Sequence, residues 1–154
     1  MSKTYRFMRQ QVLPATLPEV WEFFSSPANL AKITPAHLGF KILSAPHGDD
    51  MYAGQLIEYT VKPIMNIPLY WMTEITQVKQ HEFFIDEQRF GPYSFWHHQH
   101  HFKETANGTE MRDMVHYRVP GWILGDLANE LLVKDQLKKI FDYRYKAAEE
   151  RFKG

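Results

Sequence analysis

The sequence predicts an α+β fold in which one long C-terminal helix lies across a curved antiparallel sheet. Strand-like segments follow one another between residues 40 and 119, separated by short loops rich in Gly, Pro, Asn and Asp. A stretch without Pro or Gly then runs from Leu127 to Phe152, with apolar residues at three- and four-residue steps. A helix about 39 Å long with one apolar face must bury that face on a large surface. The only large surface that the sequence predicts is the sheet.

The N-terminal elements have clear local signals. Residues 5–12 alternate as a strand, and Thr16 with Glu19 three positions later forms a capping-box pattern for a helix over residues 17–24. Pro18 fits the first turn, where a missing N–H costs little. A second short helix is expected over residues 28–33, and Thr34-Pro35 ends it because the residue before proline avoids the α region.

The strands of the meander and the last helix follow. The predicted strands are residues 40–44, 55–62, 69–78, 82–90, 95–104 and 109–119. Pro120-Gly121 ends the last strand, and Asp126 is the expected N-cap of the helix over residues 127–152.

Composition excludes several classes of protein. The 154 residues suit a single domain, 1–154, with equal numbers of basic and acidic residues and no charge block, so no nucleic-acid partner is expected. The absence of cysteine excludes disulfides, thiolate metal sites and cysteine nucleophiles. The first residues carry no apolar signal core and no segment reaches membrane-spanning length, so we expect a cytoplasmic protein without membrane insertion. No nucleophile motif, phosphate loop or cofactor fingerprint is present, and we predict neither a cofactor nor a metal.

Four of the eight histidines lie within five residues of one predicted strand, 95–104. Successive strand side chains point to opposite faces. Trp96, His98, His100 and Phe102 therefore share one face, and their large apolar members indicate that this face points inward. His97 and His101 are expected on the outer, solvated face.

Asn107-Gly108 is a strong hairpin signal, and it predicts the pairing of this strand with the next. A two-residue loop at these positions sets His98 opposite Tyr117, His100 opposite Val115 and Phe102 opposite Asp113. Asp113 then lies diagonal to His100, within reach of its side chain. A carboxylate on an inward face needs a partner, and His100 is the nearest candidate.

Aromatic residues make up 15% of the chain, which fits either a packed core or an aromatic-lined ligand cavity. Trp71 and Thr73 share a face with Ile75 and are candidates for the wall of such a cavity. The apolar loop over residues 63–68 is either a lid over the cavity or a loop packed on the sheet edge. Periodicity does not decide which face of the 82–90 strand is inward.

The sequence resembles the START-like, birch-pollen-allergen-like superfamily, also called SRPBCC or polyketide cyclase/dehydrase-like proteins. The segments Leu17-Pro18-Glu19-Val20-Trp21-Glu22-Phe23-Phe24 and Gly108-Thr109-Glu110-Met111 are typical of it, and the resemblance covers nearly the whole chain. The pattern Trp96-x-His98-x-His100-x-Phe102, with Asp113 and Tyr117, resembles an uncharacterised ligand-binding subgroup. The resemblance implies a helix-grip fold with a largely apolar cavity, and it favours Asp86 and Gln88 as inward residues of their strand.

We therefore predict a protein that binds a small hydrophobic or aromatic molecule. The predicted ligand-binding residues are Trp71, Thr73, Asp86, Gln88, Trp96, His98, His100, Met111, Asp113 and Tyr117. Three interpretations of the polar patch stay open: a structural network whose members satisfy one another, a patch that orients a ligand, and catalysis or metal binding. In a cyclase- or dehydratase-like enzyme, the candidate catalytic residues are His98, His100 and Asp113. A module that assists a partner enzyme is a further alternative.

Overall fold

The computed structural model describes residues 3–44, 50–63, 66–121 and 132–154. Seven strands form one sheet in the order β1-β7-β6-β5-β4-β3-β2, and every neighbouring pair is antiparallel. The strands are β1 (Tyr5–Leu13), β2 (Lys41–Ile42), β3 (Leu56–Val61), β4 (Leu69–Lys79), β5 (Phe83–Phe90), β6 (Phe95–Thr105) and β7 (Gly108–Arg118). The α+β fold class and the antiparallel meander are confirmed.

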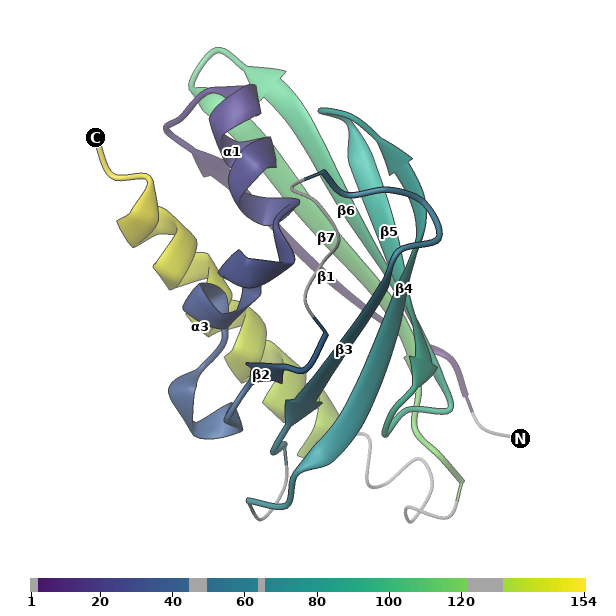
Figure 1. Ribbon diagram of the computed structural model, residues 1–154. Coiled ribbons are helices and arrows are strands. Elements are labelled where there is room, and N and C mark those ends of the chain that lie inside the picture. Colours follow the sequence, from purple (N-terminus) through teal and green to yellow (C-terminus); the bar gives the residue numbers. More distant parts are fainter. Residues whose placement is uncertain (1–2, 45–49, 64–65, 122–131) are drawn as a thin grey trace.

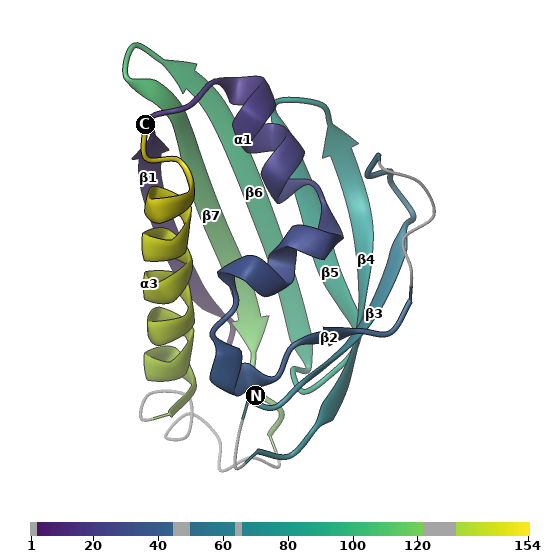
Figure 2. The ribbon, with the colours of Figure 1, turned by 60° about the vertical axis from the view of Figure 1, so that its left-hand side comes forward.

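The helices all lie on one face of the curved sheet (Figure 1). They are α1 (Leu17–Phe24), the 3₁₀ helices η1 (Pro27–Ile33) and η2 (Ala36–Leu38), and α3 (Lys134–Arg151). Figure 2 shows α3 along the β1 and β7 side of the sheet, while β3 and β4 form the far side. None of the described helices is long and apolar enough to cross a membrane.

The local signals placed α1 correctly. The Glu19 carboxylate accepts hydrogen bonds from the backbone N–H of Thr16, at 3.0 Å, and from its hydroxyl, at 2.6 Å. The predicted helix over 28–33 is η1, one residue longer, but η2 was not predicted because Thr34-Pro35 only redirects the chain. The predicted strand over 40–44 shortens to β2. The described part of the last helix begins at Lys134, so the predicted N-cap Asp126 lies outside the described residues.

The predicted register between β6 and β7 is wrong by two residues. The turn is formed by Ala106 and Asn107, and Thr105 pairs with Gly108. His100 is therefore directly opposite Asp113, and His98 is opposite Val115. Because side chains alternate with period two, a slip of two residues leaves every side chain on its predicted face.

Two clusters of buried side chains fix the helices to the sheet. One lies beneath α1, where Trp21 and Phe24 make ring contacts with Phe102 of β6. The other lies beneath α3, where Leu137 and Phe141 pack with Val115 of β7. The helices contact the sheet through these clusters, and a cavity extends between them.

Candidate functional site

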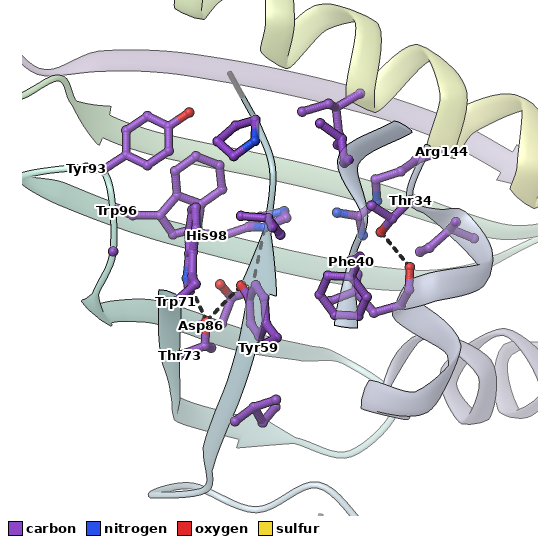
Figure 3. Close-up of a pocket in the computed structure, with 18 of the residues that line it drawn as sticks. Thr34, Phe40, Tyr59, Trp71, Thr73, Asp86, Tyr93, Trp96, His98 and Arg144 are labelled. Atoms are coloured by element: carbon purple, nitrogen blue, oxygen red, sulfur yellow. Dashed lines mark hydrogen bonds and ion pairs between the residues drawn. The ribbon is translucent and has the colours of Figure 1, made fainter. Parts of the chain in front are cut away.

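The cavity has a volume of about 750 Å³, within the range typical of sites for small organic ligands. Aromatic and aliphatic side chains from β3, β4, η1 and α3 form most of its wall. The lining aromatic residues are Phe23, Phe24, Phe40, Tyr59, Tyr70, Trp71, Phe84, Tyr93, Trp96 and Phe141. Figure 3 shows Tyr59, Trp71 and Trp96 side by side on the sheet.

Two imidazoles and two carboxylates form one polar group in the sheet, which we call the His–Asp cluster: Asp86, His98, His100 and Asp113. Asp86 is on β5, the histidines are on β6 and Asp113 is on β7. Asp86 pairs in register with His98, and His100 pairs with Asp113. Asp86, His98 and His100 line the cavity, whereas Asp113 does not and is only 3% exposed.

The hydrogen bonds of the His–Asp cluster join residues that are diagonal to each other in the sheet, not the residues that pair in register. His98 Nε2 lies 2.8 Å from Asp113 Oδ1, and His100 Nε2 lies 2.7 Å from Asp86 Oδ2. The second nitrogen of each ring faces the other carboxylate: His98 Nδ1 is 3.6 Å from Asp86 Oδ2, and His100 Nδ1 is 3.1 Å from Asp113 Oδ1. All four ring nitrogens therefore face carboxylate oxygens.

Burial and the attraction between opposite charges determine which groups of the cluster are ionised. Burial lowers the pKa of His98, and the neighbouring His100 lowers it further. Burial would also lower the pKa of His100, but the close carboxylates of Asp113 and Asp86 outweigh it and raise that pKa. The pKa of Asp113 is held well below its usual value, because the adjacent histidines outweigh the cost of burial. The geometry thus favours two carboxylates, a protonated His100 and a neutral His98.

The imidazole rings of the cluster lie close to each other and to a phenyl ring. His100 lies between Phe84, at a centroid distance of 4.1 Å, and His98, at 3.7 Å.

On the next strands, Thr73 accepts a hydrogen bond from Trp71 Nε1 at 3.1 Å, and its hydroxyl lies 3.2 Å from that of Tyr59. Burial raises the pKa of the Tyr59 and Tyr93 hydroxyls, so both are neutral. The cavity wall is therefore apolar around a few fixed polar atoms.

Six of the ten predicted ligand-binding residues line the cavity: Trp71, Thr73, Asp86, Trp96, His98 and His100. Asp86 is inward, as the resemblance implied. The structure places Gln88, Met111, Asp113 and Tyr117 elsewhere.

These four residues support the wall from behind or beside it. The Gln88 amide donates to Tyr93 O at 2.7 Å and accepts from Tyr93 N at 3.1 Å, so it holds the turn that carries a lining aromatic residue. Met111 belongs to the cluster beneath α1, and Tyr117 to the cluster beneath α3. Asp113 contacts the two histidines.

Arg144 is a cavity-lining residue that was missed from the sequence. It lies on α3, and its guanidinium carbon is 5.1 Å from the centroid of the Phe141 ring (Figure 3). Its Nε is buried and has no hydrogen-bond partner among the described residues. A signal was present: Arg144 is three positions after Phe141, on the apolar stripe that faces the sheet.

The predicted loop over residues 63–68 lies only partly within the described residues. Pro63 and Ile67 line the cavity, and the Gln136 amide of α3 donates a hydrogen bond to the carbonyl of Pro63. On the outer face of β6, His97 and His101 are half-buried, and His101 Nε2 lies 2.9 Å from Gln99 Oε1.

No protein-family model and no curated protein sequence matches the chain. Its structure is similar to solved structures at low sequence identity, including the following three. Major latex-like protein 151 of Panax ginseng gives a TM-score of 0.70 at 12% identity, over 98% of this chain and 99% of that chain. A norcoclaurine synthase point mutant of Thalictrum flavum, in complex with a transition-state analogue, gives 0.66 at 16% identity, over 98% of each chain. The protein Ara h 8.0201 gives 0.66 at 12%, over 97% of this chain and 98% of that chain. The chain therefore shares the fold of these proteins, and the predicted helix-grip fold is confirmed.

Proposed function

We propose that the protein binds a small molecule with an apolar or aromatic body in the cavity between α3 and the sheet. The observation that carries this proposal is the cavity itself, about 750 Å³ of space with a largely aromatic wall. A core that served stability alone would be close-packed, with few voids larger than a water molecule. Space of this size offers an apolar ligand a dry site.

The few polar atoms of the wall would orient the ligand. Asp86, His98 and His100 lie together on one side, and Arg144 comes from α3. A small number of fixed polar groups in an apolar pocket is the usual source of orientation and specificity. The helix-grip neighbours include one structure in complex with a transition-state analogue, which supports a ligand site in this fold.

The histidine geometry supports binding more than acid–base catalysis. A general base needs a ring nitrogen within hydrogen-bond reach of the substrate proton. Here all four ring nitrogens face the oxygens of Asp86 and Asp113. A substrate would have to break a buried contact before a ring could accept its proton.

The test is a titration of the delipidated protein with N-phenyl-1-naphthylamine, a neutral fluorescent apolar probe. We expect saturable binding of one probe per chain, with quenching of the lining residues Trp71 and Trp96 by energy transfer. The double variant Trp71→Phe/Trp96→Phe should lower the affinity for the probe, because both rings form part of the cavity wall.

Trp21 provides the matched control, because it is packed beneath α1 and does not line the cavity. Trp21→Phe should keep both the affinity and the quenching through Trp71 and Trp96. Non-saturable binding, or an affinity that Trp21→Phe lowers and the double variant keeps, would overturn the proposal.

A further inference from the structure

We propose that Asp86, His98 and His100 form a divalent metal site that opens into the cavity, with Asp113 as the residue that orients both histidines. The three candidate ligand atoms, one from each side chain, all lie within 4.8 Å of one another. All three residues line the cavity, so coordination positions on that side would be open to a ligand. The inference deepens the proposed function, because it assigns the polar end of the bound molecule a metal as its partner.

The first support is the direction of the His98 ring. A hydrogen bond between His98 Nε2 and Asp113 Oδ1, at 2.8 Å, holds the ring so that its other nitrogen is on the side of Asp86. His98 Nδ1 lies 3.6 Å from Asp86 Oδ2, which is too long for a hydrogen bond, so no direct contact blocks this nitrogen as a ligand atom.

The second support is the spacing of the ligand atoms. Nitrogen and oxygen ligands lie at about 2.0–2.2 Å from Zn²⁺, so two ligand atoms of a tetrahedral ion are about 3.4 Å apart. The 3.6 Å between His98 Nδ1 and Asp86 Oδ2 matches this separation. The 2.7 Å between His100 Nε2 and Asp86 Oδ2 is the length of a direct hydrogen bond, which would open by less than 1 Å to admit an ion.

The third support is the position of Asp113, whose carboxylate contacts both histidines. Metal-binding histidines almost always turn their other ring nitrogen to a carboxylate, a carbonyl or a water. Asp113 Oδ1 lies 2.8 Å from His98 Nε2 and 3.1 Å from His100 Nδ1, on the side away from the candidate ion. His100 Nδ1 is buried, and the Asp113 carboxylate is the acceptor that faces it.

The charges also agree with a divalent ion. An ion bound at His100 Nε2 takes the place of a proton on that nitrogen, and a divalent cation then neutralises the two negative charges of Asp86 and Asp113. Two imidazoles and one carboxylate with open positions suit Zn²⁺, Fe²⁺ or Co²⁺. The chain has no cysteine, so no thiolate competes for such an ion.

The test is a titration of EDTA-treated protein with Co²⁺ and with Zn²⁺, followed by visible absorption for Co²⁺ and by calorimetry for Zn²⁺. We expect one ion per chain and a Co²⁺ spectrum of an ordered four- or five-coordinate site. Asp86→Asn and His98→Gln should weaken binding at least 100-fold. Asp113→Asn, which leaves all three ligands in place, should weaken it by about 10- to 100-fold.

The same strand offers the control. His97 on β6 pairs with His116 on β7 on the outer face, with ring centroids 6.3 Å apart, and such a surface pair can hold an adventitious ion. His97→Gln/His116→Gln should leave the affinity within about two-fold. Loss of binding in this control variant with retention in Asp86→Asn, or a Co²⁺ spectrum identical to that of the hydrated ion, would overturn the metal site.

The two proposals fail separately. N-phenyl-1-naphthylamine binding is measured in the EDTA-treated protein, where only the apolar cavity is tested. Probe binding without metal binding rejects the metal site alone. Metal binding without probe binding rejects the proposed function alone. Circular dichroism spectra of each variant show whether a loss of binding reflects a loss of fold.

Discussion

Asp113 is the residue on which the His–Asp cluster depends most. It is 3% exposed and contacts both histidines, at 2.8 Å from His98 Nε2 and 3.1 Å from His100 Nδ1. A buried charge that loses its partner is not compensated by water. The carboxylate of Asp113 therefore has a structural role besides its proposed role in orienting metal ligands.

We expect Asp113→Asn to lower the free energy of unfolding by about 3 kcal/mol or more, because it removes one partner of a buried ion pair. Urea denaturation at neutral pH in the presence of EDTA measures this loss without any contribution from metal. Asp142→Asn is the control, since Asp142 pairs with Arg9 and Lys138 at the surface of α3 with 31% of its side chain exposed. A surface pair contributes less than about 1 kcal/mol. Equal losses of unfolding free energy in the two variants would show that the buried ion pairs of Asp113 stabilise the protein no more than a surface pair does.

The sequence predicted part of this cluster. Alternation along β6 predicted that His98 and His100 face inward, and the pattern on β7 placed Asp113 on the same face. Periodicity left the face of Asp86 open, and Asp86 proved to be the carboxylate nearest to His100 Nε2. That pairing depends on the β5–β6 register, which no local signal in either strand determines.

At the scale of elements, the β6–β7 hairpin shows how much of a hairpin a turn signal in the sequence predicts. Asn107-Gly108 predicted the hairpin, but the turn lies one residue earlier and the backbone with positive φ is at Gly108. Gly108 has φ +125°, and a Cβ there would lie 2.1 Å from the carbonyl oxygen of Leu13. The close approach of β1 to this hairpin is a tertiary contact, and it cannot be predicted from the hairpin sequence alone.

We expect Gly108→Ala to destabilise the protein by more than 3 kcal/mol, because backbone strain of about 1–3 kcal/mol adds to a clash with the backbone of Leu13. Gly54→Ala separates the two causes: Gly54 has φ +95°, but a Cβ there meets nothing within 4 Å. That control should lose only about 1–2 kcal/mol. Thermal unfolding of both variants makes the comparison, and a Gly108→Ala variant as stable as Gly54→Ala would contradict the contact with Leu13.

At the scale of the whole molecule, the cavity joins parts of the chain that are far apart in sequence. The sheet supplies Asp86, His98 and His100, and α3 supplies Arg144. The order of elements predicted that a helix would lie across the sheet. The volume left between them depends on how α3 packs against β1 and β7, so the cavity did not follow from any one segment, although the apolar stripe of α3 indicates that Arg144 faces the sheet.

Arg144 gives the cavity a cation at the helix side, and we expect it to select ligands with an anionic end. Its Nε is buried without a hydrogen-bond partner among the described residues, and hydrogen bonds to charged groups contribute about 1.5–3 kcal/mol. Unmodified protein should therefore bind dodecanoate more tightly than dodecanol, and Arg144→Met should reduce this ratio by about 10- to 100-fold. Displacement of N-phenyl-1-naphthylamine from EDTA-treated protein measures both affinities without competition from a metal.

Arg151→Met makes the same change at an exposed position of α3 that does not line the cavity, so it should leave the ratio of the two affinities unchanged. If Arg144→Met also leaves the ratio unchanged while both ligands still bind, the head group does not contact Arg144 and this prediction is wrong.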